Sequence, residues 1–123
     1  MKKTLLSLSL LALLAAAGVA GTAAADHHEG SWTGEVVDLA CYVANGAKGS
    51  DHAGCAKSCV KNGQPMGLLT DDGTLVLLAA DHKDGAAYEA LKDLAGDQAI
   101  VSGTLAEKDG MKVVTVTGSK AAA

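Results

Sequence analysis

The first 25 residues limit how much of this 123-residue chain can fold. Met1, Lys2 and Lys3 give a basic start, residues 5–19 form a Leu- and Ala-rich apolar run, and Ala23 and Ala25 follow in an A-x-A arrangement. This order is typical of a secretory signal peptide, and the apolar run is too short and wrongly flanked for a committed membrane span. We therefore expect residues 1–25 to be removed after Ala25. The mature protein would be periplasmic or secreted, with no membrane span.

The chain that remains after such a cleavage is small and acidic. Residues 26–123 number 98, which is enough for one domain. They carry eight lysines against fourteen acidic residues, a formal charge of −6, and the chain has no Arg and no Phe. Nucleic-acid binding needs a basic groove and aromatic stacking platforms, so this partner is excluded. A core built from Val, Leu, Ile and Ala would gain from support by a cross-link or a metal ion.

The pattern of apolar residues and turn signals predicts an alternation of strands and helices in this domain. Residues 26–30 are expected to be a flexible N-terminus, and residues 119–123 a tail without a structural signal. A Gly- and Asn-rich segment at residues 41–50 predicts a loop. The predicted strands are residues 31–39, 65–70, 74–80, 99–106 and 111–118, and the predicted helices are residues 51–62 and 84–95.

This order of elements predicts the fold. When helix 51–62 is taken as an insertion after the first strand, three strands, a helix and two strands remain. That is the order of the OB-fold, a small five-stranded Greek-key barrel. We therefore predict a mostly β protein with two short helices, folded as one OB-like barrel over residues 31–118. An α+β sandwich would produce a similar order and is the alternative.

All three cysteines and one histidine lie within nineteen residues, at Cys41, His52, Cys55 and Cys59. At about 100° per residue, the last three fall within an arc of about 60° on one side of the predicted helix. Three thiolates and one imidazole form a Cys3His set that suits tetrahedral Zn²⁺, and sulfur-rich sites also suit Cu(I). The cluster predicts an exported metal-binding protein with a Cu or Zn ion as cofactor. Copper handling is the first role considered, and a structural zinc is the second.

A disulfide is the alternative interpretation of the same cysteines, because thiols of exported proteins tend to pair. Cβ atoms four residues apart on a helix are roughly 5–6 Å apart, too far for an undistorted bridge between Cys55 and Cys59. Cys41–Cys59 or Cys41–Cys55 would be the pair, and it would stabilise the fold by roughly 3 kcal/mol. This interpretation predicts a disulfide-stapled OB-like module that binds a protein or a small ligand and holds no metal.

Two further features complete the functional interpretation. An enzyme could use Cys55 or Cys59 with His52 as its base, but no acid or oxyanion partner stands at a useful spacing, so we expect no enzymatic activity. Cleavage after Ala25 would free the amine of Asp26. With the amides of His27 and His28 and the His28 imidazole, this amine forms a square-planar nitrogen set of the kind Cu(II) and Ni(II) prefer. Asp26, His27 and His28 are thus a weaker candidate site.

The stretch GEVVDLACYVANGAKGSDHAGCAKSCVKNGQPMGLL, beginning at Gly34, resembles a group of small secreted bacterial proteins whose activity is not established. The resemblance covers most of residues 34–118 and is most specific in residues 41–69. It implies a signal peptide followed by a single OB-like domain, with the Cys/His cluster after the first strand. It carries no activity over to this chain.

Overall fold

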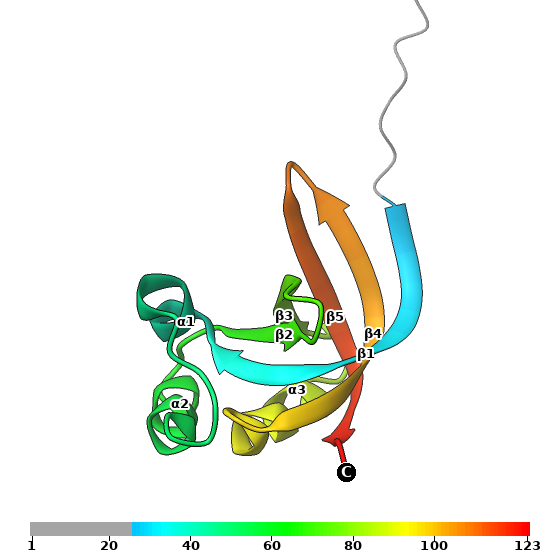
Figure 1. Ribbon diagram of the computed structural model, residues 1–123. Helices are drawn as coiled ribbons and strands as arrows, with labels where there is room; N and C mark the ends of the chain where they lie inside the picture. Colours follow the sequence, from blue (N-terminus) through cyan, green and yellow to red (C-terminus); the bar gives the residue numbers. More distant parts are fainter. Residues whose placement is uncertain (1–25) are drawn as a thin grey trace, which may run out of the picture.

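The structure is a computed structural model that describes residues 26–123 (Figure 1). The predicted signal peptide and its cleavage site lie outside the described residues. The described chain contains five strands: β1 (Asp26–Asp38), β2 (Met66–Thr70), β3 (Leu75–Ala80), β4 (Gln98–Lys108) and β5 (Met111–Ala121).

The five strands close into a barrel in the order β1-β2-β3-β5-β4. The β3–β5 pair is parallel and the other four pairs are antiparallel. This is the connectivity of an OB-like barrel, so the predicted fold class is confirmed. The closed sheet excludes the alternative α+β sandwich.

The core lies inside the barrel and follows from the alternation of apolar residues along the strands. In β4, for example, Ala99, Val101 and Gly103 are buried, while the residues between them are partly exposed. Leu91 closes the core from the helical segment between β3 and β4. The core residues are Val36, Ala56, Val60, Met66, Leu68, Val76, Leu78, Leu91, Ala95, Ala99, Val101, Val114 and Val116.

Three short helices connect the strands (Figure 1). The helices α1 (Leu39–Asn45) and α2 (Ala53–Lys61) lie between β1 and β2. The helix α3 (Ala86–Leu91) and the 3₁₀ turn η1 (Lys92–Leu94) lie between β3 and β4. The predicted helix 51–62 corresponds to α2, and the predicted helix 84–95 corresponds to α3 and η1. In the described part of the chain, no helix is long and apolar enough to cross a membrane.

The structure differs from the sequence predictions at three places. Residues 39–45 form a helix where a loop was predicted from residue 41, because Asp38 caps the backbone that follows it. Residues 26–30, predicted as a flexible terminus, extend β1 and pair with β4 from Gly30↔Gly103 to Asp26↔Glu107. The predicted tail also continues β5 to Ala121. In both strands the extension reflects pairing with the long β4, which local sequence does not reveal (Figure 1).

Candidate metal centre

Asp38 is the one buried charged side chain among residues 26–123, with 1% of its surface exposed. It is the last residue of β1, where it pairs with Met66 of β2. The backbone leaves the sheet at the next residue, and the Leu39 amide donates to the Pro65 carbonyl at 3.0 Å. The carboxylate is therefore held at the end of the barrel by the sheet.

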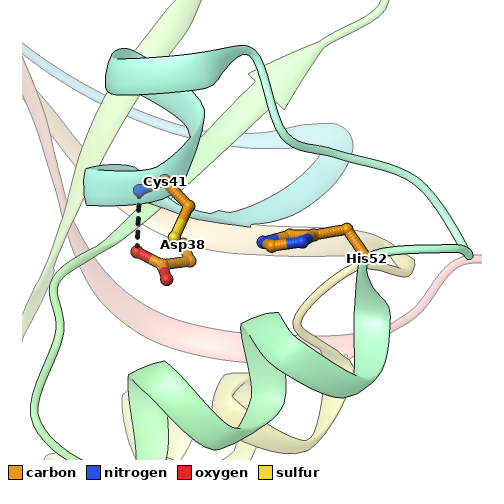
Figure 2. Close-up of side chains that lie close together, drawn as sticks. All are labelled: Asp38, Cys41 and His52. Atoms are coloured by element: carbon orange, nitrogen blue, oxygen red, sulfur yellow. Dashed lines mark hydrogen bonds between the residues drawn. The ribbon is translucent and has the colours of Figure 1, made fainter.

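The same carboxylate begins α1. Asp38 is the N-cap residue, and its Oδ1 accepts from the Ala40 amide at 3.0 Å. It also accepts from the Cys41 amide at 3.3 Å (Figure 2). An N-cap aspartate satisfies backbone N–H groups that have no partner within the helix. Capping thus fixes the carboxylate and places Cys41 in the first turn above it.

His52 approaches this pair from the loop before α2. The amide of His52 donates to the Gly49 carbonyl at 3.0 Å, and its own carbonyl accepts from Ala56 at 2.9 Å, which holds the backbone in place. Figure 2 shows the imidazole directed toward Asp38 and Cys41. A carboxylate oxygen of Asp38, the thiol sulfur of Cys41 and a ring nitrogen of His52 all lie within 4.8 Å of one another.

Two polar atoms of this group are buried without a hydrogen-bond partner, namely Oδ2 of Asp38 and Nε2 of His52. Buried polar atoms are almost always paired, because removing them from water costs free energy that a partner must offset. Both unpaired atoms are good ligands for a metal ion. A cation between them would supply the missing partner for each.

Cys59 borders the group from α2, and Cys55 is its neighbour on the same helix. They are one helical turn apart, Cys59 is half-buried and Cys55 is exposed. The Cys59 thiol interacts with the Asp38 carboxylate and with the Cys55 thiol, and it also interacts with Cys41. None of these contacts gives Oδ2 of Asp38 a partner with hydrogen-bond geometry.

The electrostatics follow from this arrangement. Burial raises the pKa of Asp38, but the neighbouring Cys41 and Cys59 thiols and the backbone amides of Cys41 and Ala40 lower it by more, so the net shift is downward. The adjacent Asp38 carboxylate and burial raise the pKa of Cys41 and raise that of Cys59 to about 12. At neutral pH the apo site therefore holds one carboxylate and protonated thiols, and a metal would have to displace the thiol protons.

The lysines of α2 do not neutralise the carboxylate. Lys57 pairs with Asp97 at 2.8 Å and Lys61 pairs with Asp93 at 2.6 Å, on the segment around η1. These pairs attach α2 to the barrel instead of balancing Asp38. The negative charge at the site is thus available to a bound cation.

The structure brings Cys41 and His52 of the predicted ligand set together and adds Asp38, which sequence analysis missed. Cys59 borders this compact group, whereas Cys55 is exposed and outside it. The available signal for Asp38 was its position directly before a helical segment, which is typical of an N-cap.

The structure also bears on the two alternatives, the disulfide and the N-terminal nitrogen set. No pair of the three cysteines lies at disulfide distance, and all three are free thiols. Asp26, His27 and His28 are exposed on β1, where Asp26 pairs with Glu107 of β4. The nitrogen set predicted there would require this segment to leave β4.

Comparison of the chain with known proteins found no matching family model, no matching curated protein and no matching solved structure.

Proposed function

We propose that this domain is a small exported protein that binds one metal ion through Asp38, Cys41, His52 and Cys59. The observation that carries the proposal is the pair of buried ligand atoms without partners, Asp38 Oδ2 and His52 Nε2, beside a free thiol. The proposed role is binding and not catalysis. Export is part of the proposal and depends on the predicted signal peptide.

Zn²⁺ is the metal that this donor set favours. Carboxylate, imidazole and thiolate are all ordinary zinc ligands, and four of them give the tetrahedral geometry of a closed site. Cu(I) prefers thiolates and imidazole, and has less use for a carboxylate. The buried Asp38 therefore moves zinc ahead of copper, although copper remains the occupant that the cysteines alone would suit.

Metal content and thiol counting test the proposal. Protein prepared without oxygen in the presence of zinc should contain about one Zn per chain, and a chelator should release it. Denatured with chelator and without reductant, that preparation should expose all three thiols. His52→Ala should weaken zinc binding strongly, whereas His82→Ala, in an exposed loop, is the matched control and should leave it unchanged.

The opposite result would support the disulfide-stapled binding module. That module predicts one free thiol, a mass two hydrogens below the reduced chain and no stoichiometric metal. If protein prepared without oxygen and with added metal contained neither zinc nor copper, the proposed metal site would be overturned. Equal metal content in the His52→Ala and His82→Ala variants would also contradict the proposal.

A further inference from the structure

Cys55 is the member of the Cys/His cluster that faces solvent. It is exposed, whereas Asp38 is buried and Cys41, His52 and Cys59 are partly buried. Its thiol is nevertheless within reach of Cys59, which in turn interacts with Asp38 and Cys41. A continuous series of ligand groups thus runs from the surface to the buried carboxylate.

Helix α2, which carries Cys55, is held against the barrel by buried side chains and ion pairs. Ala56 and Val60 are buried in the core, and Lys57 and Lys61 form ion pairs with the segment around η1. Moving α2 away from the barrel would break all of these contacts. Rotation of the Cys55 and Cys59 side chains is the lower-cost way for a metal to reach or leave the site.

We propose that Cys55 is an exchange ligand, through which the site passes its metal ion to and from a thiol-bearing partner. This inference rests on the proposed function, and it identifies the partner by chemistry as a soft-donor molecule with accessible cysteines. A partner thiol reaches Cys55 at the surface without entering the buried group.

The exchange involves no change of oxidation state. During uptake, Cys55 loses its thiol proton to water and forms a metal–sulfur bond, while a partner thiolate breaks its own bond to the metal and takes up a proton. Cys59 then repeats the substitution at the second partner thiolate. Cys41 next loses its thiol proton to water and binds the metal, while Cys55 is released from the metal and takes a proton back from water. Asp38 and His52 complete the set. Delivery follows the same steps in reverse.

The test compares wild type with Cys55→Ser, using Zn²⁺ as the metal. Zinc-loaded protein is mixed with a synthetic peptide that carries a Cys-x-x-Cys pair, and the transfer is followed in a stopped-flow instrument. Cys55→Ser should keep its equilibrium zinc affinity but transfer the ion more slowly by about tenfold or more, a barrier increase of about 1.4 kcal/mol. Ser58→Ala, an exposed substitution on the same helix, is the control and should behave as wild type.

Three outcomes would overturn the inference. Transfer by Cys55→Ser at the wild-type rate would exclude an exchange role. A fall in zinc affinity that accounts for the whole change in rate would make Cys55 an ordinary ligand. Wild-type protein that binds no zinc would overturn both this inference and the proposed function, whereas the first two results leave the metal site itself intact.

Discussion

At the scale of single residues, Asp38 serves two purposes with its two oxygens. Oδ1 caps α1 by accepting from Ala40 and Cys41, while Oδ2 is buried and unpartnered. A capping role alone would leave Oδ2 an uncompensated buried oxygen. Oδ1 is therefore the capping atom and Oδ2 the candidate metal ligand. Because the two roles use different oxygens, mutation can separate them.

We predict that Asp38→Asn keeps the helix cap but loses the metal. The amide oxygen of Asn can still accept from Ala40 and Cys41, since Asn and Asp are comparable N-cap residues, whereas the anionic ligand is gone. Zinc affinity should fall by at least the 10–100-fold that loss of a supporting group around a metal usually costs. Competition with a chromophoric chelator would measure it.

Asp38→Ala is the companion variant and removes both functions. Without the cap, the free energy of unfolding of the apo protein should fall by about 1 kcal/mol relative to Asp38→Asn, measured by urea denaturation with chelator present. Equal zinc affinity of Asp38→Asn and wild type would show that the carboxylate only caps α1.

At the scale of elements, the site depends on how α2 meets the segment that leads into β4. Gly96 has φ +83° and donates from its amide to the Val36 carbonyl of β1 at 2.7 Å. A side chain at this glycine would meet Ala53 at the start of α2, with its Cβ only 2.5 Å from the Ala53 Cβ. The position of His52, one residue before, is therefore coupled to the absence of a side chain at Gly96.

We predict that Gly96→Ala destabilises the domain and loosens the metal site, because the new methyl group must push α2 away. Gly73→Ala is the matched control, since Gly73 has the same φ of +83° but open space around it. The control should lower the free energy of unfolding by about 1–2 kcal/mol, because of the left-handed backbone alone. Gly96→Ala should lower the free energy of unfolding by more and should also lower zinc affinity.

Urea denaturation and zinc competition on both variants would check this prediction. If the two glycine variants lost the same stability and kept the same zinc affinity, close packing of α2 at Gly96 would have no bearing on the site.

Individual helices and strands differ in how far the sequence alone can predict them. The hairpin of β2 and β3 and the helix α2 were predictable because their signals are local: alternation, a turn at Asp71-Asp72-Gly73, and a glycine after the helix. Helix α1 is not predictable in the same way, because residues 41–50 have a loop-like composition and the helix depends on the cap that Asp38 supplies. The ligand role of Asp38 depends on the approach of His52 across the α1–α2 loop, which no spacing in the chain encodes.

At the scale of the whole molecule, the candidate site lies where the chain leaves the barrel between β1 and β2. The end of β1, the first turn of α1 and the residue before α2 meet around the buried carboxylate of Asp38. The chain that does this is a domain of 98 residues after the predicted cleavage, and the buried residues of its core include no aromatic side chain. Export should therefore be detectable in the mass of the intact protein, and metal binding in its thermal stability.

Export should yield a mature chain that begins at Asp26. The basic start, the apolar run and the small residues Ala23 and Ala25 predict this cleavage. Intact-mass measurement on protein recovered from the periplasm or the medium would check it, with protein from whole cells as the control. A mature protein that still contained residues 1–25 would contradict the prediction.

Zinc should raise the stability of the whole domain, because a ligand that binds the folded state alone shifts the unfolding equilibrium. At a free zinc concentration 100 times the dissociation constant, the free energy of unfolding should rise by about 2.7 kcal/mol. For a domain of this size that corresponds to an increase in Tm of roughly 10–20 °C. Reductant must be present throughout, so that disulfide formation does not stabilise the apo protein. Asp38→Asn should show little of this increase, since its apo fold is retained and its metal site is not. A Tm that is the same with zinc and with chelator would mean that the buried group around Asp38 holds no ion in the folded protein.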